Sequence, residues 1–238
     1  CEIGLRPTDL HLSSLRLMGA QIETEGGVLS CRCPDGLRGE KITLSFPSVG
    51  ATENILIAAA AADGETVILN AAREPEIADL ADFLCSCGAH ISGAGSGEIT
   101  VCGMKKLHSA EHTVIPDRII ASTYMAAAAV TGGDVHILDT RAEHITPVIP
   151  VFEQAGCKVD CGENSVHISA PVRLRSGQTV RTMPYPGFPT DSQAAVMAML
   201  SVAHGTSVMI ENIFENRYRH VRELCRRGAD IMTEAKSR

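Results

Sequence analysis

The stretch Cys85-Ser86-Cys87-Gly88-Ala89-His90-Ile91 is one of four similar stretches spread along the 238 residues. In each of them an amphipathic helical pattern ends at a glycine, and a strand pattern follows. Glycine readily adopts the left-handed conformation that stops a helix, so each stretch predicts a helix, a stop and a strand. The four glycines lie 68 to 72 residues apart, at Gly19, Gly88, Gly156 and Gly228.

Three Ala-rich segments alternate with these stretches and predict a second set of helices. Each segment is closed by a glycine, and an apolar or β-branched strand pattern follows it. Small Ala side chains let a helix approach a sheet closely, which favours helices buried between layers of strands. The segments are residues 54–62, 121–130 and 192–203, their glycines are Gly64, Gly133 and Gly205, and the strand patterns are residues 66–69, 134–138 and 206–210.

Together the two patterns predict an α/β fold built from repeated units of about 70 residues. Each unit is expected to run strand, helix, strand, helix, strand, strand. A domain boundary is expected near residues 108–116, after the strand pattern at residues 98–103. The predicted domains are therefore residues 1–115 and residues 116–238.

The composition argues against nucleic acid and membrane partners. Aromatic residues make up 3% of the chain and Trp is absent, so aromatic platforms for stacking bases are not expected. The net charge is −7 and no basic stripe is present, which excludes a nucleic acid polymer as partner. The longest apolar run, residues 55–62, is too short for a membrane span.

The nine cysteines are an odd number and occur without a signal peptide, which is typical of reduced thiols in the cytoplasm. The cysteines do not make the paired spacing of a zinc site, and no glycine-rich nucleotide-binding loop is present, so no metal and no cofactor are expected. The chain begins at Cys1 rather than Met, which indicates a fragment or removal of an upstream segment. Most other cysteines are expected to be buried and inert: Cys31, Cys33, Cys87, Cys102, Cys157 and Cys225.

Three helix entrances are candidate anion sites, because the free backbone N–H groups and the helix dipole favour negative charge there. They lie at residues 48–52, 116–118 and 186–192. The Ser, Thr and Asp residues at these entrances suit simple helix capping equally well. The residue pattern alone leaves both interpretations open.

The run Cys1-Glu2-Ile3-Gly4-Leu5-Arg6-Pro7-Thr8-Asp9-Leu10-His11 places a thiol five residues before an arginine. An arginine lowers the pKa of a neighbouring thiol and binds phosphate through two hydrogen bonds. An N-terminal tail followed by a helix capped by Thr8 or Asp9 is the simpler alternative. Arg73 and Arg217 lie in charged loops and suit either anion binding or pairing with neighbouring acids.

Taken in order, these motifs resemble the enolpyruvyl transferases, and specifically their nucleotide-sugar branch, the UDP-N-acetylglucosamine 1-carboxyvinyltransferases. The run at residues 1–11 is similar to that family's loop cysteine and uridine-binding segment. Five further motifs match in order, at residues 48–52, 70–76, 116–118, 188–191 and 214–217. The resemblance implies an inside-out α/β barrel fold, in which residues 1–115 are the C-terminal part of the first domain and residues 116–238 the first part of the second.

The resemblance also implies roles for individual residues. The implied catalytic residues are Cys1, as proton donor, and Asp191, as the carboxylate beside the sugar hydroxyl. The implied contacts to the nucleotide sugar are Arg6, Pro7, Thr8, Asp9, Leu10, Phe46, Pro47, Ser48, Val49, Gly50 and Ile213. Residues expected to support the site are Glu74, Asp117, Arg118 and Arg217.

The implied substrates are UDP-N-acetylglucosamine and phosphoenolpyruvate. The sugar 3′-hydroxyl adds to C2 of phosphoenolpyruvate while C3 is protonated, and phosphate then leaves as C3 is deprotonated. The resemblance implies the first committed step of peptidoglycan synthesis in a bacterial cytoplasm, with consequences for cell shape and division, and inhibition by the epoxide fosfomycin at Cys1. Further phosphoenolpyruvate-binding residues are implied outside residues 1–238, so the chain alone is expected to be inactive.

Two alternatives stay open. The shikimate branch of the same superfamily also uses phosphoenolpyruvate, but it needs no loop cysteine, so the run at residues 1–11 disfavours it. A repeat fragment that keeps the fold without activity belongs to a different class. Turnover of phosphoenolpyruvate discriminates between an enzyme and such a fragment.

Overall fold

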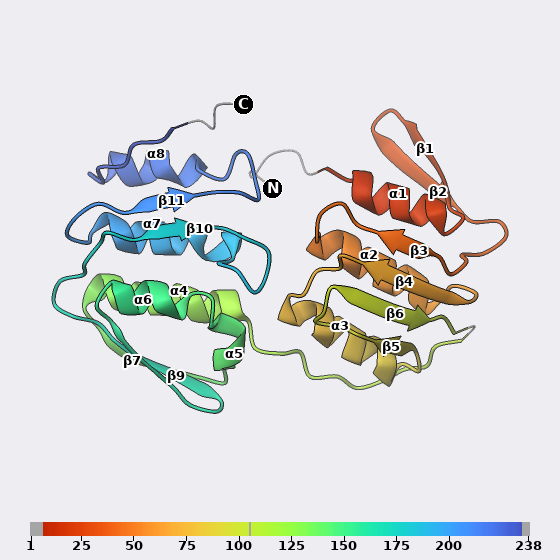
Figure 1. Cartoon of the computed structure of the whole chain (residues 1–238), viewed down its shortest axis with the longest axis horizontal. Helices are drawn as coiled ribbons and strands as arrows, with labels where there is room; N and C mark the ends of the chain where they lie inside the picture. The colour runs from red at the N-terminus through yellow and green to blue at the C-terminus, as the bar shows by residue number, and fades with distance from the viewer. Residues whose placement is uncertain (1–6, 105, 235–238) are drawn as a thin grey trace. The chain divides into compact units, whose positions relative to one another are not determined.

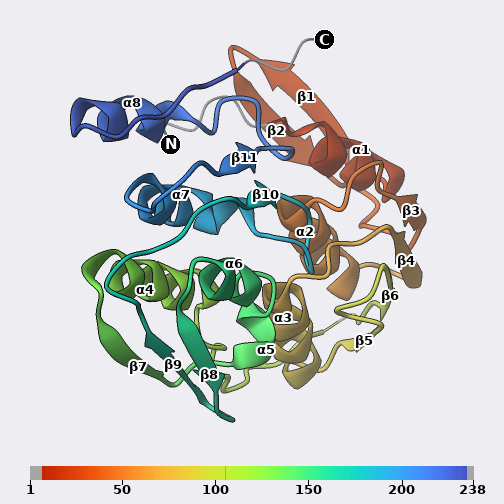
Figure 2. The same ribbon diagram turned by 60° about the vertical axis from the view of Figure 1, so that its left-hand side comes forward.

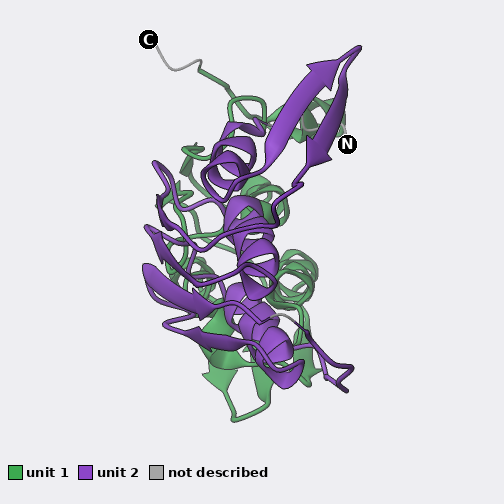
Figure 3. Cartoon of the chain, turned by 90° about the vertical axis from the view of Figure 1, so that its right-hand side faces the viewer, with its two compact units in different colours: residues 1–4, 116–238 green, residues 5–115 purple. Residues whose placement is uncertain are grey.

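A computed structural model describes residues 7–104 and 106–234, which form two compact units that divide between Ile115 and Pro116. Figure 3 draws the unit before this division in purple and the unit after it in green. They are called here the N-terminal unit and the C-terminal unit.

The N-terminal unit contains one whole repeat with the order strand, helix, strand, helix, strand, strand (Figure 1). Its four strands form a sheet in the order β3-β4-β6-β5, in which β3 and β4 are parallel and the other neighbours antiparallel. Parallel neighbours need a crossover connection, which α2 supplies. The elements are β3 (Lys41–Thr43), α2 (Val49–Ala60), β4 (Glu65–Leu69), α3 (Pro75–Ser86), β5 (His90–Ser92) and β6 (Glu98–Cys102).

A helix and a hairpin precede this repeat in the N-terminal unit. They are α1 (Asp9–Leu17) and the antiparallel pair β1 (Gln21–Glu25) and β2 (Val28–Arg32). The hairpin projects from the rest of its unit, as Figure 3 shows, and nearly all of its residues are exposed. Helix α1 instead packs against α2 and brings Met18 into the buried core.

The core of the N-terminal unit follows from the alternation of its strands. Residues that alternate along β4 and β6 are buried, so Ile68, Ile99 and Val101 face the core. Helix α2 buries Ile55 and Leu56 together with several alanines. The small alanine side chains let this helix lie close to the sheet, as its sequence predicts.

The C-terminal unit repeats the pattern, but its strands form two separate sheets. The antiparallel sheet β7-β9-β8 has the same arrangement as β4-β6-β5, and β10 pairs with β11 in parallel, as β3 does with β4. Its first elements are α4 (Arg118–Thr131), β7 (Asp134–Leu138), α5 (Ala142–Ile145), α6 (Ile149–Gln154), β8 (Lys158–Cys161) and β9 (Ser165–Ser169). Then follow β10 (Thr179–Arg181), the 3-10 helix η1 (Thr190–Ser192), α7 (Gln193–Ser201), β11 (Val208–Ile210) and α8 (Arg219–Arg226).

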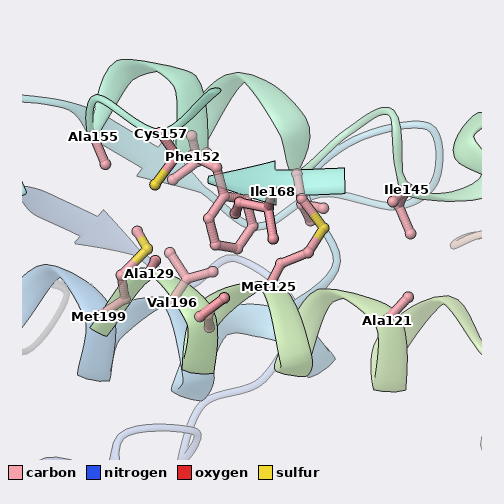
Figure 4. Packing of buried hydrophobic residues seen from close by; sticks show 14 of the residues in the cluster. Ala121, Met125, Ala129, Ile145, Phe152, Ala155, Cys157, Ile168, Val196 and Met199 are labelled. Carbon is pink, nitrogen blue, oxygen red and sulfur yellow. The ribbon is translucent and has the colours of Figure 1, made fainter. Parts of the chain in front are cut away.

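Helices α4 and α7 pack against each other and share one apolar core with the neighbouring strands (Figure 2). Phe152 of α6 is fully buried, and Met125, Ile168 and Met199 belong to the same cluster (Figure 4). Next to this core the hydroxyl oxygens of Ser122 and Ser192 lie 2.7 Å apart and join α4 to the turn before α7.

The α/β class is confirmed, and the strands of the described residues form open sheets of two, two, three and four strands rather than a closed barrel. The four repeated glycines all have positive φ, between +96° and +102°. Strands follow the first three of them, whereas residues 229–234 form none. Every helix in the described residues is too short or too polar to cross a membrane.

The predicted stops of the three Ala-rich helices are all misplaced. Helices α2 and α7 end at Ala60 and Ser201 and are capped by Ala61 and Val202, three residues before Gly64 and Gly205. Helix α4 is closed by Gly132, which has φ +65°, and not by Gly133. The Gly133 N–H donates to Ala128 O at 2.8 Å, and this bond requires the left-handed residue to come just before it.

The prediction that most cysteines are buried is also wrong. Of the eight cysteines in the described residues, only Cys87 and Cys157 are buried. Cys33 is half-buried, and Cys31, Cys102 and Cys225 are exposed. The apolar patterns around them identify the elements but not the face on which each thiol lies. Cys102, for example, follows the buried Val101 in β6 and so lies on the opposite face.

Candidate active site

Asp191 lies in η1, at the entrance of α7, and its side chain is 58% exposed. No side-chain hydrogen bond caps either η1 or α7, so the capping alternative does not account for this residue. Arg217 instead contacts it, with Nη2 2.5 Å from Asp191 Oδ1 and 3.3 Å from Thr190 O. The guanidinium carbon of Arg217 also lies 5.6 Å from the ring centre of Phe214. An accessible carboxylate is thus held beside a mostly buried cation.

A buried carboxylate, Glu211, fixes the turn that carries Asp191. Glu211 directly follows β11 and is 7% exposed. Five donors surround its two oxygens at 2.7 to 3.2 Å: the Thr182 and Thr190 hydroxyls, the Gln193 amide and the backbone N–H groups of Ile213 and Phe214. The carboxylate therefore ties the end of β10, η1, α7 and the loop after β11 to one point.

Tyr218 holds the same loop from its other end. The Tyr218 hydroxyl donates to Met209 O and accepts from the Glu211 N–H, both at 2.9 Å. Burial raises the pKa of the Tyr218 phenol, so it remains a donor at neutral pH. Burial also lowers the pKa of the neighbouring His220, with the Arg217 charge acting in the same direction.

Asp117 and Arg118 stand at the entrance of α4, which packs against η1 within the same unit. Asp117 Oδ1 accepts from the Ile119 N–H at 2.7 Å and from the Ile120 N–H at 3.1 Å, so this side chain caps α4. Arg118 is buried, and its guanidinium carbon lies 5.6 Å from the ring centre of Tyr185. The structure brings Asp117, Arg118, Asp191 and Arg217 into one region of the C-terminal unit.

In the N-terminal unit, the entrance of α1 lies against the entrance of α2. His11 Nδ1 lies 2.6 Å from Asn54 Nδ2, and a Cβ added to Gly50 would lie 3.2 Å from His11 Cε1. Glycine at position 50 therefore permits the close approach of the two helices. This contact brings residues 7–10 near residues 46–50, the two segments expected to contact the same nucleotide sugar.

Ser48 caps α2, because its Oγ accepts from the Ala51 N–H at 3.4 Å. Phe46 shortly before it is 41% exposed, and Pro47 and Val49 are half-buried. The entrance of α2 thus offers an accessible aromatic ring next to backbone N–H groups of a first helical turn. Thr8, at the start of α1, makes no side-chain capping bond, so that alternative does not hold for Thr8.

Glu74 lies buried at the entrance of α3, where its Oε2 accepts from the Arg73 N–H at 3.0 Å. Burial raises the pKa of Glu53, and the charges of Glu76 and Glu74 raise it further. Glu74 therefore contributes negative charge between α2 and α3 rather than an accessible ligand group.

Cys1 and Arg6 lie outside the described residues, and their roles stay predictions. Ile213 is half-buried, and its N–H belongs to the Glu211 network. Sequence reasoning missed Glu211 and Tyr218. Glu211 could have been found from its place in the sequence, since it is a single acid directly after an apolar strand pattern. A carboxylate at such a position is buried only if hydrogen-bond donors surround it.

The repeated α/β fold and the ordered motifs at the helix entrances together define a class of enolpyruvyl transferases. The chain belongs to the EPSP synthase (3-phosphoshikimate 1-carboxyvinyltransferase) family, whose model matches residues 1–237.

Among curated proteins, the chain is similar to enzymes of the nucleotide-sugar branch. It is 52% identical over 237 residues to UDP-N-acetylglucosamine 1-carboxyvinyltransferase 1 of Caldanaerobacter subterraneus subsp. tengcongensis, covering 100% of this chain and 57% of that protein. It is 50% identical over 236 residues to the UDP-N-acetylglucosamine 1-carboxyvinyltransferase of Finegoldia magna, covering 98% and 56%. The chain thus spans little more than half the length of the curated relatives it matches.

Solved structures show the same fold. The enolpyruvyl transferase NikO from Streptomyces tendae matches with a TM-score of 0.86 at 22% identity, covering 97% of this chain and 57% of that one, a likeness that concerns the fold alone. The EPSP synthase from Acinetobacter baumannii matches with a TM-score of 0.64 at 28% identity, covering 86% and 48%.

Proposed function

We propose that the protein containing this chain transfers the enolpyruvyl group of phosphoenolpyruvate to the 3′-hydroxyl of UDP-N-acetylglucosamine, with release of phosphate. One observation carries the proposal: relatives named for that activity are 48 to 52% identical over 98 to 100% of this chain. In this proposal the reaction takes place in a bacterial cytoplasm and is the first committed step of peptidoglycan synthesis.

The proposed chemistry is an addition followed by an elimination. The sugar 3′-hydroxyl gives its proton to Asp191 as its oxygen bonds to C2 of phosphoenolpyruvate, and Cys1 gives a proton to C3. The adduct then loses phosphate from C2 and a proton from C3, which leaves the enol ether on the sugar. The accessibility of the Asp191 carboxylate supports the role of base, and Arg217 supports it by holding that carboxylate in place.

The nucleotide sugar is proposed to bind residues 6–10 and 46–50, with Ile213 as a further contact. The contact between the α1 and α2 entrances supports a shared role for the two segments. The first N–H groups of a helix lack intrahelical partners and favour phosphate, so the α2 entrance suits the diphosphate. Glu74, Asp117, Arg118 and Arg217 are proposed to support the site.

We further propose that residues 1–115 are the C-terminal part of a first enolpyruvyl transferase domain and residues 116–238 the first part of a second. The shared order of elements in the two compact units supports this division. The incomplete coverage of the longer relatives agrees with parts of two domains rather than two whole ones.

The shikimate branch is the second candidate activity, and the family description and the match to an EPSP synthase structure at 28% identity favour it. The higher identity to the nucleotide-sugar enzymes favours the first candidate. A fragment without catalytic activity is the third possibility for the chain taken alone.

The test uses the full-length product of the gene that contains this segment. Phosphate release from phosphoenolpyruvate is measured with UDP-N-acetylglucosamine and, separately, with shikimate 3-phosphate. We expect turnover with the first acceptor only. Turnover with shikimate 3-phosphate alone would contradict the proposal. If phosphate is released with neither acceptor, the protein is not an enolpyruvyl transferase and the proposal fails. The isolated 238-residue chain is expected to be inactive, and its turnover would contradict that expectation.

A further inference from the structure

Four polar side chains outside the proposed active site lie across the sheet β7-β9-β8. His136 of β7 pairs in register with His167 of β9, which pairs in turn with Asp160 of β8. Asp134 lies two residues before His136 in β7, and alternation along a strand puts both on the same face. The register therefore collects two imidazoles and two carboxylates from three strands (strands labelled in Figure 2).

The side chains are close enough to act together. The His136 and His167 rings are stacked, with centroids 4.0 Å apart and an interplanar angle of 8°. His167 Nε2 lies 2.8 Å from Asp134 Oδ1, and His167 Nδ1 lies 3.7 Å from Asp160 Oδ2. One ligand atom each from Asp134, His136 and His167 lies within 4.8 Å of the others.

These groups suit a divalent transition metal. Imidazole and carboxylate together favour borderline ions such as Zn²⁺, whereas Mg²⁺ and Ca²⁺ favour oxygen ligands alone. Around a tetrahedral Zn²⁺ with bonds of 2.0 to 2.2 Å, ligand atoms are about 3.3 Å apart, a spacing that side-chain rotation here can reach. Asp134 and His136 are exposed and His167 is half-buried, so an ion can reach them without opening the core.

We propose that Asp134, His136 and His167 form a surface site for one borderline divalent metal ion, with Asp160 beside it as a further carboxylate. On binding, the ion takes the place of the Nε2 proton between His167 and Asp134; from a doubly protonated His167 that proton goes to solvent, and the Nδ1 proton stays on the ring. The remaining coordination position is filled by water. Spacing along the sequence does not reveal the site, because its residues come from separate strands.

The test is calorimetric titration of the full chain with Zn²⁺ after alkylation of accessible thiols, because the exposed cysteines would otherwise bind the ion. We expect one ion per chain. His136→Ala and His167→Ala should each weaken binding by at least the roughly 10–100-fold that loss of an outer-shell partner costs, because each removes a direct ligand. His90→Ala is the matched control, since His90 is an exposed histidine in β5, and it should leave binding unchanged.

Proton NMR of the unsubstituted chain gives a second readout that depends on no variant. The imidazole signals of His136 and His167 should shift on addition of Zn²⁺, and a large excess of Mg²⁺ should not reverse the shift. The proposal is overturned if the alkylated chain takes up no Zn²⁺, if both alanine variants bind it as tightly as the parent, or if other histidines shift instead. Because the test needs no turnover, its result is independent of the proposed enolpyruvyl transfer.

Discussion

Replacement of Glu211 by Gln tests whether the turn carrying Asp191 depends on a buried acceptor. Every group around the Glu211 carboxylate is a donor, including the backbone N–H groups of Ile213 and Phe214. Gln has nearly the same volume but offers one acceptor and one donor. In either orientation of its amide, at least two of the five original donors face an NH₂ group.

We expect Glu211→Gln to lower the free energy of unfolding because the side chain loses its charge, since its volume hardly changes. If the new NH₂ faces Thr190 and Gln193, the hydroxyl can rotate and the amide can flip, since Gln193 Oε1 has no hydrogen-bond partner in the described residues. The three bonds at the other oxygen persist but become neutral. Hydrogen bonds to charged groups contribute about 1.5–3 kcal/mol and neutral ones about 0.5–1.5, so we expect a loss of about 3 kcal/mol in the free energy of unfolding.

Thermal unfolding followed by circular dichroism measures this loss. A change of about 3 kcal/mol should lower Tm by about 6–12 °C in a chain of this length. Glu163→Gln, which changes an exposed glutamate in the turn between β8 and β9, is the matched control and should leave Tm nearly unchanged. If Glu211→Gln has the same Tm as Glu163→Gln, the buried carboxylate does not hold the turn and the reasoning is refuted.

Three further predictions concern the same unit. In the full-length enzyme, Asp191→Ala should lower kcat by about 10²-fold or more while weakening nucleotide-sugar binding less; near-normal kcat in steady-state assays would remove Asp191 from the chemistry. Asp117→Ala should lower the free energy of unfolding by about 1 kcal/mol through loss of the α4 cap, and Asp117→Ser should restore most of it in urea titrations. Because burial lowers the pKa of His220 below its ordinary value of 6.5, the unfolded chain takes up a proton first as pH falls, so stability should decrease below about pH 6.5. His220→Gln should flatten that decrease in urea titrations at several pH values, and an unchanged slope would contradict the assignment.

The sequence predicted the repeating elements well because each has a local signal. The strand predicted at residues 134–138 is β7, and the helix predicted at residues 121–130 is the middle of α4, which starts earlier because Asp117 caps it. The helix expected between β7 and β8 is instead divided into α5 and α6. The cause lies in Pro147, which has no N–H to donate to Glu143 O and so interrupts the helical hydrogen-bond ladder after Ile145.

The candidate site was predictable only where charge marks an exposed loop. Asp191 and Arg217 stand out in this way, and their pairing is found in the structure. Glu211 does not, because its importance depends on donors brought from three other segments in addition to its own loop. His136 and His167 were equally hidden, since 31 positions separate them and only the strand register joins them.

The sheets described above pair strands that lie close in the chain. The widest pairing in the described residues joins Glu65 to Cys102, 37 positions apart, and the next joins Asp134 to Ser169. Loop-closure entropy is modest over such spans, so each sheet can close soon after its own strands leave the ribosome. The docking of α7 on α4, by contrast, must wait for a segment about 70 residues later, as the Ser122–Ser192 contact shows. Synthesis from the N-terminus therefore delivers nearly complete sheets one after another, and the C-terminal unit is complete only once β11, which follows α7, has joined β10.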